Sequence, residues 1–206
     1  MTKREKLIID LFKNKCIDFG KFKLKSGITS PVYIDIRKLV SYPSLMKKCA
    51  AAYWQTLKKL NFDRIAGVPY AALPIASVIS VEYKVPMVYM RKEKQDHGIT
   101  KLIQGEYKKG EKVVVIDDIV TTSNSKFIAI KPLEKSGLKV KDVLILLDRE
   151  QGGKSNLKAK GYNLYSIFMM TEALDILKKY KKITKKKYQE VINYLKDSKK
   201  KLKTKN

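Results

Sequence analysis

The chain has 206 residues, 44% of them hydrophobic and 32% charged, and its formal net charge is +25. The apolar fraction argues against disorder over most of the length. Two cysteines are too few for a small disulfide-rich protein. No apolar run approaches the roughly 20 residues that a membrane-spanning helix needs. We therefore expect a cytoplasmic protein that folds as a single domain over residues 1–206, with Cys16 and Cys49 as small reduced core residues.

The N-terminal part of the sequence predicts a helix, two short strands and a second helix. Residues 2–15 place apolar side chains at helical spacing, and residues 19–24 alternate apolar and basic residues as a half-exposed strand does. A loop over 26–31 and a short strand over 32–36 follow. Pro43 then opens a helix that is expected to reach Leu60.

From residue 63 onwards, strand patterns alternate with helical patterns. Strands are expected at 63–68, 86–90, 112–117, 140–147 and 162–169, and helices at 71–82, 123–137, 174–180 and 188–202. The charged stretch 91–110 has no clear period and is long for a loop inside a compact domain, which is typical of a functional lid. The alternation predicts an α/β fold with a parallel sheet covered by helices on both faces.

The positive charge is concentrated at the C-terminal end of the chain. Residues 178–206 hold 13 lysines against Glu190 and Asp197, and we expect residues 199–206 to fray. Of the 45 basic residues only five are arginine, the residue that nucleic-acid sites favour for bidentate contacts. The excess therefore indicates mainly solvated surface lysine, with affinity for a polyanion as the alternative.

The sharpest candidate site follows the strongest predicted strand. The buried run 113–116 leads into two adjacent carboxylates, Asp117 and Asp118, and then into a hydroxyl-rich loop and a helix. In open α/β sheets ligands bind at the carboxyl ends of strands, and free N–H groups ahead of a helix form a phosphate cradle. Carboxylates repel phosphate, so the pair suits ribose hydroxyls or a divalent metal. The alternative is an acidic pair that only caps the helix.

Four segments, in this order along the chain, resemble the orotate phosphoribosyltransferases, which are type I phosphoribosyltransferases. Residues 22–37 resemble their N-terminal signature, and residues 91–98 resemble their mobile catalytic loop. Residues 113–125 resemble the phosphoribosyl-pyrophosphate motif of the wider family, and residues 147–153 resemble the loop that holds orotate.

The amino-acid sequences of these motifs and of residues 67–74 are similar to the first domain of the bifunctional UMP synthases. The resemblance runs from about residue 5 to residue 178 and leaves the lysine-rich end uncovered. Nothing in the chain resembles the decarboxylase domain of UMP synthase, so the resemblance implies a stand-alone transferase.

The resemblance implies the type I phosphoribosyltransferase fold, with residues 1–40 as a small N-terminal hood and residues 178–206 as a C-terminal helix and tail. It implies transfer of ribose 5-phosphate from phosphoribosyl pyrophosphate to orotate, giving orotidine 5′-monophosphate and pyrophosphate in pyrimidine biosynthesis. It also implies a homodimer with shared active sites. Mg²⁺ is the implied cofactor, held mainly by substrate and water with no direct protein ligand.

The resemblance also implies roles for individual residues. Asp117 and Asp118 would grip the ribose hydroxyls, and together with Lys92 and His97 they form the implied catalytic set. The implied contacts to the donor are Lys25, Tyr70, Ala71, Arg91, Lys92, His97, Asp117, Asp118, Ile119, Val120, Thr121, Thr122, Ser123, Asn124 and Ser125. The implied contacts to orotate are Lys25, Tyr33, Ile34, Thr121 and Arg149. The Arg149 fork fits the orotate carboxylate, whereas Arg37 is expected to support the fold through Asp35.

Two residues depart from the family pattern. Position 95 is Gln where the family usually has Lys, and position 123 is Ser where the family usually has Gly, which tolerates a positive φ. Two other hypotheses stand beside the orotate enzyme, the first because purine transferases share the Asp117-Asp118 motif and the second because of the net charge and these two departures. One is a transferase for another base. The other is a catalytically weak regulator with this fold that binds nucleotide or nucleic acid, although a nucleic-acid partner is the less favoured expectation.

Overall fold

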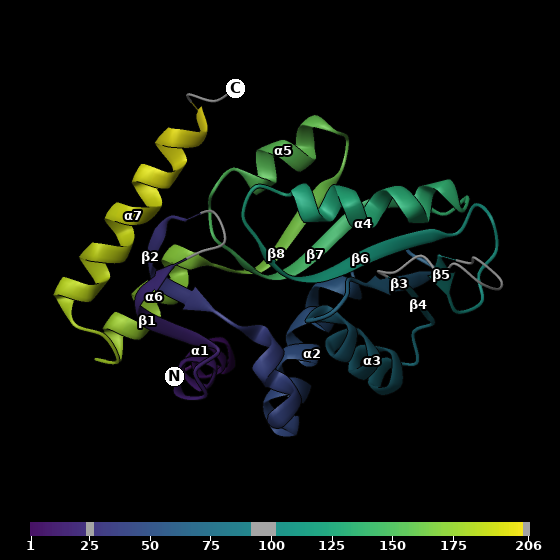
Figure 1. Ribbon diagram of the computed structural model, residues 1–206. Helices are drawn as coiled ribbons and strands as arrows, with labels where there is room; N and C mark the ends of the chain where they lie inside the picture. Colours follow the sequence, from purple (N-terminus) through teal and green to yellow (C-terminus); the bar gives the residue numbers. More distant parts are fainter. Residues whose placement is uncertain (24–26, 92–101, 204–206) are drawn as a thin grey trace.

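The computed structural model describes residues 1–23, 27–91 and 102–203, and the side chains as far as Lys199. Within these ranges the chain forms a two-stranded sheet and a six-stranded sheet flanked by helices (Figure 1). None of the helices in the described ranges combines the length and the hydropathy that a bilayer crossing requires.

The N-terminal part forms a helix and a hairpin-like pair of strands. Helix α1 (Lys3–Lys13) begins at a capping box in which the Thr2 and Glu5 side chains satisfy each other's backbone N–H groups. Strands β1 (Ile17–Lys23) and β2 (Thr29–Ile34) pair antiparallel, and a 3₁₀ helix η1 (Ile36–Ser41) leads into α2 (Pro43–Leu57). The predicted loop over 26–31 is wrong for its last three residues, because Thr29 and Ser30 pair with β1 and start β2 there.

The central sheet has the order β5-β4-β3-β6-β7-β8. All neighbouring strands run parallel except β5, which pairs antiparallel with β4 at the edge. The strands are β3 (Arg64–Gly67), β4 (Met87–Met90), β5 (Ile103–Gln104), β6 (Lys112–Val120), β7 (Lys139–Asp148) and β8 (Asn163–Met169). Residues 113–116 of β6 are buried on both faces, as a strand in the middle of a parallel sheet requires.

Helices cover both faces of this sheet, as the alternation predicts. The remaining helices are α3 (Ala72–Tyr83), α4 (Asn124–Lys135), α5 (Gly153–Ala159), α6 (Met170–Lys179) and α7 (Lys185–Lys203). Helices α4 and α5 lie over one face, and α2 and α3 lie over the other (Figure 1). Gly67 permits close packing of α3, because a Cβ at this position would lie 2.9 Å from the Ala76 Cβ. Cys16 and Cys49 are buried in the core, where burial raises the pKa of their thiols to about 11 and about 12.

Several boundaries differ from the sequence-based expectation. Strand β6 runs past the acidic pair to Val120, because Ile119 and Val120 still pair with β7. The short elements α5 and β5 were not predicted, α2 stops at Leu57 instead of Leu60, and α6 begins at Met170.

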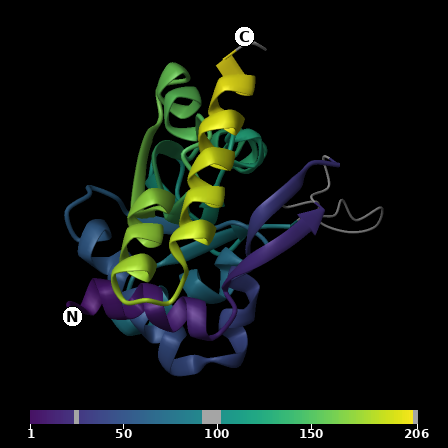
Figure 2. The same cartoon turned by 90° about the vertical axis from the view of Figure 1, so that its left-hand side faces the viewer.

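The C-terminal helix α7 is slightly longer than the predicted helix over 188–202. It begins at Lys185 and continues to Lys203, and so includes the first part of the segment that is expected to fray. Val191 and Leu195 are buried, and the helix packs against α6 and β2. Figure 2 shows α7 alongside α6, with the β1–β2 ribbon next to it.

Candidate active site

The carboxyl ends of β3 and β6 meet the β2 strand around a cavity of about 360 Å³. Its lining comes from β2 and the segment after it, from the turn after β3, and from β6. The lining residues are Tyr33, Ile34, Asp35, Arg37, Pro69, Tyr70, Ala71, Asp117 and Asp118. The structure thus gathers two implied orotate contacts (Tyr33 and Ile34), two implied donor contacts from the turn after β3 (Tyr70 and Ala71) and the acidic pair in one place. The Pro69–Tyr70 peptide bond in this turn is cis.

The acidic pair sits in two different environments. Asp117 is 5% exposed, and its Oδ2 lies 2.6 Å from the Lys126 ammonium, itself 3% exposed. The Tyr53 hydroxyl donates to the Asp117 backbone carbonyl at 2.7 Å. Asp118 is half-buried, and burial together with the negative charge of Asp117 raises its pKa to about 7, although Lys126 opposes the shift. One carboxylate is therefore held by a buried cation, and the other faces the cavity with weakened acidity.

The loop after β6 offers backbone donors. In the described part of the chain, the N–H groups of Thr121, Thr122 and Ser123 donate to no other protein atom. They lie between the end of β6 and the first turn of α4, where the helix dipole favours an anion. This arrangement matches the predicted phosphate cradle in its chemistry.

Ser123 adopts the backbone conformation for which the family uses glycine. Its φ is 78°, in the left-handed region that non-glycine residues rarely enter. The side chain is buried, and its hydroxyl donates to the Gly153 carbonyl at 2.7 Å. Gly153 must itself be glycine, because a Cβ there would lie 2.5 Å from Val120 Cγ2 and 2.8 Å from the Thr121 carbonyl oxygen. The serine is thus accommodated by a contact with the orotate-loop segment.

Arg149 stands at the junction of β2 with the end of β6. Its backbone N–H donates to the Val120 carbonyl at 3.0 Å, and Nη2 lies 3.5 Å from the Ser30 hydroxyl. Its Nε is buried and has no hydrogen-bond partner within the described chain. A buried donor without an acceptor is costly, and a carboxylate would satisfy it in the bidentate geometry that arginine favours. Arg149 is not among the residues that line the 360 Å³ cavity.

Arg37 behaves as predicted toward Asp35 but also reaches the cavity. Its Nε and Nη2 donate to the two Asp35 carboxylate oxygens at 2.6 and 2.9 Å, and Nη2 also donates to the Tyr33 hydroxyl at 3.2 Å. The Arg37 hydrogen bond holds the pKa of the Asp35 carboxyl below its ordinary value. Tyr33 stacks on Phe22 with ring centroids 5.3 Å apart. This cluster fixes the β2 side of the cavity.

Part of the predicted site lies outside the described residues. Lys25, Lys92 and His97 fall there, as does the unusual Gln95. Arg91 is described and exposed, and its backbone N–H donates to the Leu102 carbonyl at 2.9 Å. Tyr70 is 61% exposed at the mouth of the cavity.

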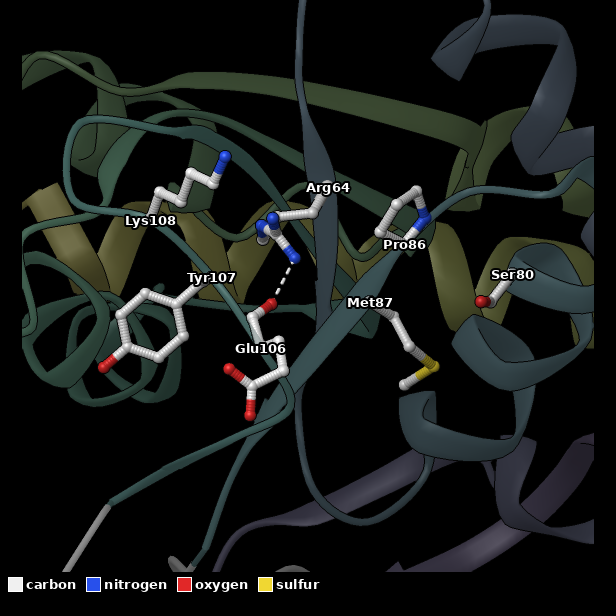
Figure 3. Close-up of a pocket in the computed structure, with 7 residues that line it drawn as sticks. All are labelled: Arg64, Ser80, Pro86, Met87, Glu106, Tyr107 and Lys108. Atoms are coloured by element: carbon white, nitrogen blue, oxygen red, sulfur yellow. Dashed lines mark hydrogen bonds between the residues drawn. The ribbon is translucent and has the colours of Figure 1, made fainter.

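A larger cavity of about 530 Å³ lies at the other end of the sheet, where β3 and β4 begin (Figure 3). It is lined by Arg64, Ser80, Pro86, Met87, Glu106, Tyr107 and Lys108. The Arg64 guanidinium is already bound to the Glu111 carboxylate at 2.6 and 2.7 Å and to the Glu106 carbonyl. This cavity therefore lacks the unpaired donor found at Arg149, and it lies at the end of the parallel strands where ligands are not expected.

Sequence reasoning missed two residues of the site, Lys126 and Tyr53. Lys126 carried one usable signal, since a lysine in the first turn of a helix opposes the helix dipole and needs a special partner. Tyr53 carried none, because its inward position on α2 is equally typical of a plain core residue.

Comparison with known proteins agrees with this geometry. Residues 36–163 match the family model described as "Phosphoribosyl transferase domain". The chain is 39% identical to the uridine 5′-monophosphate synthase of Bos taurus, over 93% of this chain and 40% of that protein. It is 41% identical to the orotate phosphoribosyltransferase of Pyrobaculum islandicum, over 87% of this chain and 92% of that protein.

A solved structure, that of Leishmania donovani UMP synthase, superposes with a TM-score of 0.87 at 42% identity and covers 94% of this chain and 42% of that one. The chain thus spans about two-fifths of the two UMP synthases and nearly the whole archaeal transferase. Because the family model covers more than half of the chain and the archaeal enzyme matches over almost its full length, the chain belongs to the orotate phosphoribosyltransferase family of phosphoribosyl transferases.

Proposed function

We propose that this protein transfers ribose 5-phosphate from phosphoribosyl pyrophosphate to a ring nitrogen of orotate, releasing pyrophosphate. Its family and its near full-length match to an orotate phosphoribosyltransferase support this reaction. The observation that carries the acceptor assignment is Arg149, whose buried Nε has no partner in the described chain. An acceptor with a carboxylate would supply that partner.

Different residues of the site would bind different parts of the two substrates. The free N–H groups of Thr121 to Ser123 would bind the 5′-phosphate at the N-terminus of α4. Asp118, which lines the cavity, would meet the ribose hydroxyls and stabilise positive charge as it develops on the sugar. Arg149 would fix the acceptor carboxylate beside Thr121. The C–N bond to orotate forms as the C–O bond to pyrophosphate breaks. Pyrophosphate takes the electron pair of the C–O bond, and the proton of the orotate ring N–H is released to pyrophosphate or solvent.

The proposal includes Mg²⁺ as cofactor. Among the described residues no group of three or more His, Cys, Asp or Glu side chains could hold a metal ion, and Lys126 already engages one oxygen of Asp117. This donor set fits a cation held mainly by donor phosphates and water, which is how Mg²⁺ prefers to bind. Asp118 is the carboxylate that would contact its hydration shell, and the ion, when bound, would supply positive charge toward the pyrophosphate.

Four further expectations stay proposals. The family implies a homodimer with shared active sites. The composition and the sequence pattern support the other three proposals, which are a cytoplasmic location, a single domain over residues 1–206 and the absence of a nucleic-acid partner. Light scattering at micromolar concentration tests the first of them, and a monomer there would contradict it.

The test of the proposed function is the loss of orotate absorbance in the presence of phosphoribosyl pyrophosphate, Mg²⁺ and the protein. Arg149→Ala should weaken orotate binding by about 2–5 kcal/mol, which is at least about 30-fold in KM, and leave the donor KM nearly unchanged. Arg149→Lys should recover little, because an ammonium lacks the fork.

Lys158→Ala is the matched control, since Lys158 is exposed on the neighbouring α5 and its removal changes the net charge equally. Tight donor binding without orotate turnover in the unaltered protein would instead favour the regulator. Equal losses toward both substrates in Arg149→Ala would make Arg149 a structural residue.

A further inference from the structure

Lys126 is the one lysine that is buried among the residues whose exposure the structure describes. It sits in the first turn of α4, where a positive charge opposes the helix dipole. Desolvating an ammonium is expensive unless it is paired and hydrogen-bonded. A position that is unfavourable on two counts needs a compensating set of contacts.

The contacts of Lys126 satisfy its three donors. The Nζ atom lies 2.6 Å from Asp117 Oδ2 and 3.3 Å from the Ser125 hydroxyl, and it also donates to the Ile119 backbone carbonyl. Ile119 lies near the end of β6, and Ser125 lies in the first turn of α4. The lysine therefore ties Asp117 to the segments on both sides of the phosphate-binding loop.

These contacts leave the two acids with different freedom. Asp117 has one carboxylate oxygen on Lys126, and its Oδ1 accepts from the Asp118 N–H at 2.9 Å. Asp118 uses its Oδ1 on the Ile119 N–H at 2.8 Å, is half-buried and lines the cavity. Lys126 also reduces the net negative charge of the acidic pair. Its buried ammonium cancels one of two adjacent negative charges, which would repel a polyanionic donor.

We propose that Lys126 is a positioning residue for ribosyl transfer, which holds Asp117 and the phosphate-binding loop in one geometry so that Asp118 is the carboxylate left to meet the ribose. This inference rests on the proposed function and deepens it by assigning different roles to the two acids. Lys126 acts through Asp117 and the loop and does not itself contact the substrate.

The first test is Lys126→Met, which keeps the length of the side chain and removes its charge. We expect kcat/KM for phosphoribosyl pyrophosphate to fall on the order of 100-fold, the loss typical of one preorganised electrostatic contact. Lys131→Met is the matched control, because Lys131 is an exposed lysine of the same helix, and it should behave like the unaltered protein.

The second readout is the pH profile of kcat/KM for the donor. Among the side chains that shift the pKa of Asp118, Asp117 raises it and Lys126 lowers it. The apparent pKa of the profile should therefore rise in Lys126→Met and stay in place in Lys131→Met. If Lys126 exerts no electrostatic influence on Asp118, Lys126→Met should change only the amount of folded protein and leave this pKa unmoved.

The double variant Lys126→Met/Asp117→Asn keeps the test decisive if the single variant folds poorly. It removes both charges of the buried pair, so it should fold better than Lys126→Met and regain at least about tenfold in kcat/KM over it. Asp118→Asn should remain inactive. A folded double variant that is as inactive as Asp118→Asn would overturn the division of roles, and so would a Lys126→Met variant with unchanged kinetics and pH profile.

A calorimetric titration with phosphoribosyl pyrophosphate separates this inference from the proposed function. If the unaltered protein does not turn over orotate, the proposed function fails, but donor binding still compares Lys126→Met with Lys131→Met. Weaker binding in Lys126→Met alone would then support the positioning role, and equal binding would contradict it.

Discussion

Ser123 shows how a single side chain can hold a backbone conformation that its own chemistry disfavours. A left-handed conformation costs a non-glycine residue about 1–2 kcal/mol. The hydrogen bond from the Ser123 hydroxyl to the Gly153 carbonyl offsets about 0.5–1.5 kcal/mol of this. The departure from glycine is therefore nearly neutral in this chain, and it joins the phosphate loop to the segment that follows Arg149.

This balance predicts opposite behaviour for two small substitutions. Ser123→Gly should change the free energy of unfolding by less than about 1 kcal/mol, because relief of strain offsets the lost hydrogen bond and the added chain entropy. Ser123→Ala keeps the strain and removes the hydrogen bond from the Ser123 hydroxyl to the Gly153 carbonyl, so it should destabilise by about 0.5–1.5 kcal/mol. Urea unfolding of both variants measures the difference. Equal stability of the two would contradict the role of the hydroxyl.

The raised pKa of Asp118 should make the stability of the folded protein depend on pH. Its pKa in the folded chain is raised to about 7 by burial and by Asp117, from an ordinary value of about 3.9. The protonated carboxyl therefore contributes stability that is complete below about pH 3.9 and is lost as the pH rises through about 7. Asn cannot ionise and keeps that contribution at high pH.

We accordingly expect Asp118→Asn to melt at a higher temperature than the unaltered protein at pH 8, with a difference that shrinks toward pH 5, while transferase activity is lost. Thermal unfolding without substrates at several pH values measures this. A melting-temperature difference that does not vary with pH would show that Asp118 ionises normally in the fold.

At the scale of elements, α7 connects the lysine-rich end of the chain to the predicted orotate site. The helix packs on β2, and its Val191 and Leu195 are buried. Burial raises the pKa of the Tyr194 phenol, but hydrogen bonding to Ser30 and the positive charge of Arg149 lower it, and the net shift is downward. Tyr194 therefore stands next to the arginine that is proposed to bind the acceptor.

Two truncations test separately whether the last residues of the chain and the whole of α7 contribute to activity. Ending the chain after Ser198 removes only the last helical turn and the residues beyond it, so activity should stay within a few-fold. Ending it after Thr184 removes all of α7 and exposes the apolar surface beneath it, so stability should fall and the orotate KM should rise more than the donor KM. Tyr194→Phe tests the side chain alone through the same ratio of KM values. Full activity after the longer truncation would show that α7 has no part in the site.

At the scale of the whole molecule, the net charge of +25 acts on a polyanionic donor. Summed positive charge raises the local concentration of anions, and salt screens it over about 10 Å at 0.1 M. We expect kcat/KM for phosphoribosyl pyrophosphate to fall between about 0.05 and about 0.5 M KCl, more steeply than kcat/KM for orotate, which carries less charge. Stopped-time assays at fixed Mg²⁺ measure both slopes. Parallel slopes would mean that the lysines are spread too evenly to steer the donor.

Local sequence patterns are enough to predict several parts of this protein. The apolar run 113–116 predicts a buried strand because only a central parallel strand is covered on both faces, and the acidic pair that follows it marks the ligand-binding end. The order of the motifs predicts the parallel sheet, its flanking helices and the family. Cys16 and Cys49 were correctly predicted as core residues for the same reason, since their neighbours follow helical or strand periodicity.

Contacts between residues far apart in the chain became visible only once the chain was folded. Periodicity indicates which side of an element is buried but not which residues it is buried against. It therefore could not predict the contacts of Lys126 with Asp117, of Ser123 with Gly153 and of Arg149 with Ser30. The elements β5 and α5 were missed because two or seven residues are too few to display a period. Lys126 read as one solvated lysine among many, because burial of a charge is set by the carboxylate that the fold brings beside it.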